Sequence, residues 1–232
     1  MIRHIIWDFD GTLFNTYPAI VYSFKTVLQS DFGVQYSPEE IERLVMVDAR
    51  HCVLDAGQKY GLDPDAVLSK VRDFYNSQTD VAELPYDGSR EVCKSIAQRG
   101  GINALVTHRE RSSTIAMLER FCMLGLFSII LTADDGFAPK PAPDSFCYVV
   151  NSASLDPTEI LAVGDRDLDI EAAIAAGIRC AFFNPEGKVH PKADVSIQTL
   201  REIKKLEQVN NHLFQRPKQK MKKRSTDKEF PS

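Results

Sequence analysis

Short apolar runs recur along this chain, and each is bounded by polar residues, glycine or proline. Segments in which apolar residues recur with helical spacing lie between them. Strands that alternate with helices predict an α/β fold with a parallel sheet and helices on both faces. Unbroken apolar runs also fit strands that are covered on both sides. The expected strands lie at 5–7, 102–106, 128–131, 160–163 and 180–183, and the expected helices at 90–98, 112–120, 144–152 and 168–175.

The stretch 16–84 breaks this alternation, because it has helical patterns and no convincing strand. Pro38 and Pro64 follow the plausible N-caps Ser37 and Asp63, so each is expected at a first helical position. We interpret this stretch as an all-helical cap inserted into the first strand–helix connection. Its expected helices include 19–28, 38–47 and 64–75, and the chain is expected to return to the α/β core at 85–88.

The C-terminal end differs from the rest of the chain. A last amphipathic helix is expected from 198 to about 209. Residues 214–232 then contain seven Lys/Arg against two Asp/Glu, a composition that predicts no fixed structure. The expected organisation is a core formed by 1–15 and 85–212, a helical cap at 16–84 and a basic tail at 213–232.

Composition is that of an ordinary soluble protein, with 44% hydrophobic and 26% charged residues among 232. The net charge of −4 does not indicate a dedicated nucleic-acid binder. Five scattered cysteines without a CxxC pair are typical of reduced, mostly buried thiols in a cytoplasmic protein. No signal peptide or membrane span is expected, since every apolar run is too short.

Two aspartates, Asp8 and Asp10, follow the first apolar run and are separated by one residue. Side chains alternate along a strand, so both carboxylates are expected on one side of the strand end. In open α/β sheets, ligands bind at that edge. Adjacent carboxylates repel each other unless a cation or a shared proton relieves the charge. The pair therefore predicts a metal site or acid–base chemistry.

Other chemistry-bearing residues stand at the ends of further expected strands. Thr107 ends the second strand, and Lys140 lies in a proline-rich loop after the third. Asp165 ends the fourth strand, and Asp169 comes four residues later. Because a parallel sheet carries its strand ends to one edge, we expect these groups to meet the first aspartate pair. Taken singly, Thr107 could instead cap a helix, and Lys140 could be an ordinary loop lysine.

In order and spacing, these residues resemble the four motifs of the haloacid dehalogenase-like (HAD) hydrolase superfamily. The resemblance covers about residues 1–205 and implies a Rossmann-like core. The helical insertion resembles the cap of the phosphoglycolate-phosphatase-like branch, although many relatives have an acidic residue where Asn15 stands. The four motifs are Asp8-x-Asp10-x-Thr12, Thr107-His108-Arg109, Lys140-Pro141 and Gly164-Asp165-x-x-x-Asp169.

The resemblance implies a role for each residue. Asp8 would attack phosphorus and form an aspartyl-phosphate, which divides one hard displacement into two easier ones. Asp10 would protonate the leaving alcohol and then take a proton from the attacking water. Lys140 would hold Asp8 and offset the phosphate charge. The implied substrate-binding residues are Thr12, Thr107, His108 and Lys140.

The implied cofactor is Mg²⁺, which prefers oxygen ligands in an octahedron. The family pattern provides a carboxylate oxygen of Asp8, the backbone carbonyl of Asp10, and Asp165. Asp169 would hold a metal-bound water or orient its neighbours. The implied partner is a small phosphorylated substrate, without nucleic acid or membrane.

The function that these features favour is a Mg²⁺-dependent phosphatase for a small metabolite such as phosphoglycolate. A phosphomutase of the β-phosphoglucomutase type, which shares every core motif, is an alternative hypothesis. A catalytically silent binding protein on the same fold is a third hypothesis. Dehalogenation is disfavoured because it does not need the acid–base group Asp10. Substrate choice is expected to depend on cap side chains near Arg50, His51 or Lys59, and the oligomeric state is left open.

Overall fold

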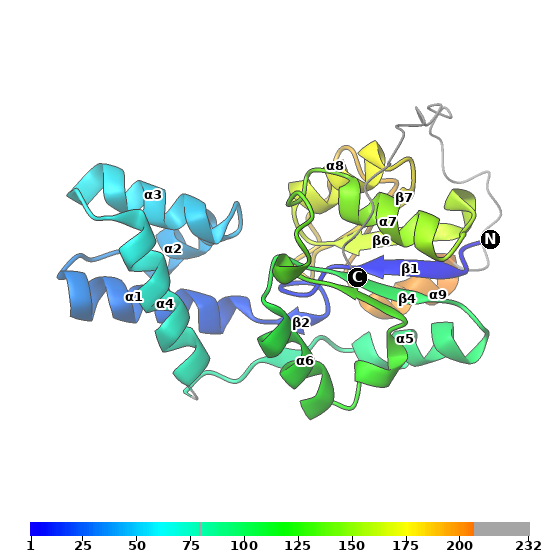
Figure 1. The fold of residues 1–232 in the computed structure, drawn as a ribbon, viewed down its shortest axis with the longest axis horizontal. Coiled ribbons are helices and arrows are strands. Elements are labelled where there is room, and N and C mark those ends of the chain that lie inside the picture. The colour runs from blue at the N-terminus through cyan, green and yellow to red at the C-terminus, as the bar shows by residue number, and fades with distance from the viewer. Residues whose placement is uncertain (79, 207–232) are drawn as a thin grey trace, which may run out of the picture.

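The computed structural model describes residues 1–78 and 80–206, so the basic tail and the end of the last expected helix lie outside the described residues. Figure 1 shows two parts, a layered α/β core and a separate group of four helices beside it. The helical group comes from the segment between the first two core strands, and two chain crossings connect it to the core.

Within the described residues, the core contains a six-stranded sheet in the order β5-β4-β1-β6-β7-β8. All neighbouring strands are parallel, with Ile6 opposite Ala104 on one side and Ala162 on the other. β1 therefore lies inside the sheet, which fits the apolar run of residues 5–7 within it. The strands are β1 (His4–Trp7), β4 (Asn103–Val106), β5 (Ile129–Leu131), β6 (Ile160–Gly164), β7 (Arg179–Phe183) and β8 (Val195–Ile197).

Helices cover both faces of this sheet (Figure 1). Alternate residues of β1 face opposite ways, with Ile5 and Trp7 in one apolar cluster and Ile6 in the other. The first cluster includes residues from α5 (Ser89–Gln98), α6 (Arg111–Arg120) and α9 (Ile203–Leu206). The second includes residues from α7 (Asp144–Ser152) and α8 (Asp167–Ala175). The α/β class predicted from the sequence is confirmed.

The four cap helices bury an apolar cluster of their own, which includes Phe24, Ile41, Val53 and Val67. Their starts follow ordinary capping chemistry. Ser37 forms a capping box with Glu40, and Asp63 accepts a hydrogen bond from the second helical residue of α4. The helices are α1 (Tyr17–Phe32), α2 (Pro38–Val45), α3 (Ala49–Tyr60) and α4 (Pro64–Ser77).

Several elements differ from the sequence expectation. A short antiparallel ribbon pairs β2 (Phe14–Asn15), where the chain enters the cap, with β3 (Leu84–Pro85), where it returns. It is too short to show alternation, as is the edge strand β8. The last helix begins later than expected, because Thr199 caps a short turn that precedes α9.

None of the five cysteines, all of which lie in the described part of the chain, is in a disulfide; three are buried, Cys147 is half-buried and Cys122 is exposed. No helix among the described residues has the length and apolar content that crossing a membrane requires.

Candidate active site

The first candidate residue, Asp8, directly follows β1 and is fixed there by the sheet. Its backbone N–H donates to the carbonyl of Val163 on β6 at 2.9 Å, which extends the ladder by one residue. On the other side, Thr107 follows β4 and donates its N–H to Leu131 at 3.0 Å. The side chain of Asp8 is almost completely buried at this edge. Backbone pairing with β6 thus fixes the position of Asp8 independently of its side-chain contacts.

Lys140 reaches the same point from the loop after β5. Its Nζ lies 2.5 Å from Oδ1 of Asp8 and 2.5 Å from Oδ1 of Asp169, and it also donates to the carbonyl of Val106 at 3.1 Å. Burial opposes the charged ammonium, but Asp169 and Asp8 outweigh it and raise the pKa of Lys140. The lysine is therefore a charged bridge between two buried carboxylates.

Asp8, Asp165 and Asp169 form a buried carboxylate cluster, with one oxygen of each lying within 4.8 Å of the others. Burial and the charges of Asp8 and Asp169 raise the pKa of Asp165 to about 8. The Oδ2 atom of Asp8 is buried and has no hydrogen-bond partner among the described residues. Three converging carboxylates with an unused oxygen match the hard oxygen donors that Mg²⁺ prefers. The three carboxylates could thus bind a divalent cation, which would offset their mutual repulsion.

Asp165 is held by two hydroxyl groups. Thr12 donates to its Oδ1 at 2.9 Å, and Tyr17 donates to its Oδ2 at 2.7 Å. Burial and the charge of Asp165 raise the pKa of Tyr17, which keeps the phenol protonated as a donor. Gly11 has a φ of +82°, and a Cβ there would collide with Asp165 and Tyr17. The glycine of the first motif therefore makes room for the aspartate of the fourth.

Asp169 lies in the first turn of α8 and caps that helix. Its Oδ2 accepts a hydrogen bond from the backbone N–H of Arg166 at 3.1 Å, while its other oxygen faces Lys140. A Cβ on Gly164 would overlap the Asp169 side chain, so this glycine also provides space for a carboxylate. Helix capping and charge pairing together fix Asp169 against the cluster.

Asp10 does not join the carboxylate cluster. Its Oδ1 accepts a hydrogen bond from Nη1 of Arg109 at 3.0 Å. The same guanidinium donates to the hydroxyl of Tyr75 at 2.7 Å and lies 3.8 Å from Glu83. Tyr75 belongs to α4 and Glu83 to the chain that returns from the cap. The second aspartate of the first motif is thus tied to the cap by an arginine.

Thr107 and His108 form the turn after β4. The hydroxyl of Thr107 accepts a hydrogen bond from the backbone N–H of Arg109 at 3.0 Å. Nε2 of His108 accepts the backbone N–H of Lys140 at 2.9 Å, which requires a neutral ring. Burial and the charges of Lys140 and Arg166 lower the pKa of His108 to about 4. His108 therefore acts on the lysine loop as an acceptor, in the form that it has at neutral pH.

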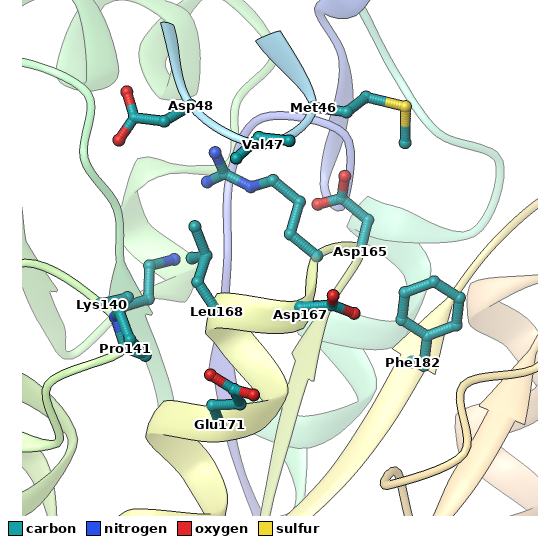
Figure 2. A pocket seen from close by; sticks show the side chains of 11 residues that line it. Met46, Val47, Asp48, Lys140, Pro141, Asp165, Asp167, Leu168, Glu171 and Phe182 are labelled. Carbon is teal, nitrogen blue, oxygen red and sulfur yellow. The ribbon is translucent and has the colours of Figure 1, made fainter. Parts of the chain in front are cut away.

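A cavity of about 510 Å³ opens between the cluster and the cap. Figure 2 shows the α2–α3 loop, with Met46, Val47 and Asp48, on the other side of this cavity from Lys140. The cap residues proposed from the sequence to choose the substrate are not among those that line this cavity. Arg50 pairs with Asp65 at 3.1 Å and Lys59 pairs with Asp55 at 2.9 Å, both within the cap.

Five side chains at the site have no role assigned from the sequence: Tyr17, Tyr75, Glu83, Arg109 and Arg166. Tyr17 and Tyr75 lie in helical patterns, where an aromatic residue is usually part of an apolar core. Arg166 stands inside the fourth motif, between Asp165 and Asp169. That position, like the position of Arg109 in the second motif, is the available signal, although spacing alone does not give the direction of a side chain.

Comparison with known proteins agrees with this geometry. Residues 5–183 match the family model described as haloacid dehalogenase-like hydrolase. The chain is 30% identical over 183 residues to pyrophosphatase PpaX of Bacillus pumilus, covering 78% of this chain and 82% of that protein. It is 25% identical over 211 residues to N-acetylmuramic acid 6-phosphate phosphatase of Pseudomonas aeruginosa, covering 87% and 93%.

A solved structure resembles the whole arrangement of core and cap. It is the crystal structure of a predicted phosphoglycolate phosphatase from Haemophilus somnus, with a TM-score of 0.75 and 25% identity. The superposition covers 89% of this chain and 98% of the other. The similarity therefore extends through the helical cap as well as the sheet.

Proposed function

Because this chain belongs to the haloacid dehalogenase-like hydrolases and its relatives are named phosphatases, we propose that it is a Mg²⁺-dependent phosphatase acting through an aspartyl-phosphate on Asp8. The observation that carries the proposal is the state of Asp8. Its carboxylate is buried, one oxygen is paired with Lys140, and the other has no partner among the described residues. A buried carboxylate oxygen without a donor is costly unless a ligand uses it.

In the first step, a carboxylate oxygen of Asp8 forms a bond to phosphorus while the bond between phosphorus and the leaving oxygen breaks. Lys140 keeps the Asp8 carboxylate oriented and offsets the negative charge that collects around the phosphoryl group. The hydroxyl of Thr107 and nearby backbone N–H groups donate hydrogen bonds to the phosphoryl oxygens. These residues provide positioning and charge, which dominate phosphoryl transfer.

Asp10 donates a proton in the first step and takes one back in the second. It protonates the leaving oxygen, then removes a proton from the water that attacks the phosphoryl group and regenerates Asp8. Its pairing with Arg109 places a cation beside the carboxylate when it is ionised, as it must be for the second step. General acid–base help of this kind is worth about 10²–10⁴-fold in rate.

Mg²⁺ would be held by the carboxylates of Asp8 and Asp165 and by the backbone carbonyl of Asp10, with Asp169 orienting the ligands. When bound, the ion neutralises carboxylate charge and polarises a phosphoryl oxygen. Thr12 and Tyr17 keep both oxygens of Asp165 in place from the protein side. This second layer of hydroxyl donors is what a cation site needs to keep its ligand fixed.

The substrate is a small phosphorylated metabolite. The named relatives act on pyrophosphate and N-acetylmuramic acid 6-phosphate, and the similar crystal structure is described as a predicted phosphoglycolate phosphatase. Each of these compounds is small and has an acidic group besides the phosphoryl group that is transferred. The 510 Å³ cavity has the size of a typical small-molecule site.

The direct test is phosphate release by wild type and by Asp8→Asn with p-nitrophenyl phosphate and with phosphoglycolate, in Mg²⁺ and after chelation. We expect turnover in wild type that chelation removes and Mg²⁺ restores, and no turnover in the variant. Asp73→Asn, an exposed aspartate of α4, is the matched control and should retain activity. Persistent activity of Asp8→Asn contradicts the proposal, and interconversion of sugar phosphates without phosphate release would identify a mutase instead.

A further inference from the structure

Arg166 lies beside the carboxylate cluster and is held there almost without hydrogen bonds. Its side chain is 13% exposed, and the nearest acidic contact of its guanidinium is Nε to Oδ2 of Asp169 at 4.0 Å. Nε is buried and has no hydrogen-bond partner among the described residues. Arginine stays charged and has five donors in a planar fork. A charged group that is buried with unused donors is costly to the free protein.

The other charges around the cavity already have partners. Asp48 accepts the backbone N–H of Arg50 at 2.7 Å, and Figure 2 shows its carboxylate turned away from Lys140. Asp167 pairs with His190 at 2.8 Å and Glu171 pairs with Lys192 at 2.7 Å. Lys140 is engaged by two carboxylates at once. Among the cavity-lining residues that the structure describes, Arg166 is thus the cation with a buried donor that has no partner.

Arg166 and the turn formed by Thr107 and His108 line different cavities. Arg166 lines the cavity that extends to Met46 and Val47 of the cap. Thr107 and His108 line a second hollow, and Lys140 is common to both. A substrate whose phosphoryl group lies at Asp8 would extend past Arg166 toward the cap. The cap lines this cavity with Met46, Val47 and Asp48, so none of the described cap residues there is a cation that competes for an anion.

We infer that Arg166 binds a second anionic group of the substrate, a carboxylate or a second phosphate, and so selects phosphorylated metabolites that carry one. The inference rests on the proposed phosphatase function and narrows its substrate class. The planar fork of arginine matches the paired oxygens of carboxylate and phosphate, and charge-assisted bonds of this kind are strong. Substrates with a neutral group at that point would leave the arginine unpaired and bind less well.

The kinetic test uses substrates that differ only in this group. Phosphoglycolate is compared with hydroxyethyl phosphate, in which an alcohol replaces the carboxylate, and pyrophosphate is a separate arm for the second-phosphate case. The readout is kcat/KM for the acidic substrate divided by kcat/KM for the neutral one. Arg166→Gln should reduce this ratio by roughly 10–100-fold, and Arg166→Lys should retain part of it. Arg50→Gln is the control, since it removes the same charge from a cap residue that is 58% exposed.

A binding arm removes the dependence on turnover. Titration calorimetry in Mg²⁺ compares phosphonopropionate with propylphosphonate, a pair without a cleavable bond that differs in the carboxylate. Wild type and Arg50→Gln should prefer phosphonopropionate, and Arg166→Gln should lose that preference while keeping its circular-dichroism spectrum. If wild type releases no phosphate from any substrate, the proposed function is contradicted. The calorimetric comparison would still test whether Arg166 binds the second anionic group.

Three results would overturn the inference. One is a wild type that does not distinguish the acidic from the neutral compound. Another is an equal loss on both compounds in Arg166→Gln, which would show that the arginine serves the transferred phosphoryl group or the fold. The third is a loss of preference in Arg50→Gln, which would show that the cap recognises the anion.

Discussion

The metal-free protein should become less stable as pH rises, because Asp165 is buried among carboxylates. Its pKa is raised from 3.8 to about 8 in the folded state. A raised folded-state pKa means that folding binds a proton, so the contribution is fully present below about pH 4 and is lost as pH rises through about 8. Keeping this carboxyl protonated costs several kcal/mol more in free energy at about pH 8 than at about pH 4, on the order of 1.4 kcal/mol for each pH unit.

The measurement is the free energy of unfolding from urea titrations of wild type and Asp165→Asn between about pH 4 and pH 8, with a chelator present. Wild type should lose several kcal/mol more than the variant over this range, because asparagine does not titrate. Mg²⁺ should stabilise wild type increasingly as pH rises, since it offsets the ionised carboxylates. The variant should respond weakly to Mg²⁺.

Parallel stability profiles for the two proteins would refute this reasoning, because they would show that Asp165 ionises in the folded state without cost. If stabilisation by Mg²⁺ were independent of pH, or equal in both proteins, it would contradict the prediction that Mg²⁺ offsets the charge of ionised Asp165. Asp73→Asn serves as the control for removal of an exposed carboxylate.

Three further substitutions test other parts of the account. Lys140→Met leaves buried carboxylates unpaired and should cost about 3–5 kcal/mol in urea unfolding as well as phosphate release; unchanged stability would mean that the lysine is not a charged bridge. Arg109→Met frees Asp10 from its cation, so kcat should fall about tenfold or more with a smaller change in KM, whereas an unchanged kcat would show that the pairing is incidental. Phe24→Ala removes a buried aromatic ring from the cap cluster and should lower the free energy of unfolding by about 3–5 kcal/mol, whereas an unchanged value would show that the ring does not stabilise the folded protein.

The sequence could predict the sheet and much of the site because both depend on short-range patterns. Apolar runs identified five of the six strands that the described residues contribute to the core sheet, and the residues directly after these strands include Asp8, Thr107 and Asp165. A parallel sheet brings such positions to one edge, whatever the rest of the chain does. The edge strand β8 escaped because its three residues pair with β7 without forming an apolar run.

The contacts that the sequence could not predict depend on side chains from separate elements. The partner of Asp10 is Arg109, and the pair continues to Tyr75 on a cap helix 34 residues away along the chain. Whether Arg166 faces solvent or the cavity depends on the geometry at the start of α8 rather than on spacing. Such directions are decided by packing between cap and core, which local periodicity does not encode.

The central claim is that Asp8 carries the phosphoryl group, and trapping that adduct tests it most directly. Wild type turning over phosphoglycolate or p-nitrophenyl phosphate in Mg²⁺ is quenched rapidly in acid, digested and analysed by mass spectrometry. The account predicts a phosphorylated peptide whose modified residue is Asp8, absent from Asp8→Asn and from chelated wild type. Active turnover with phosphorylation at another residue, or with no adduct at any quench time while phosphate is released, would contradict it.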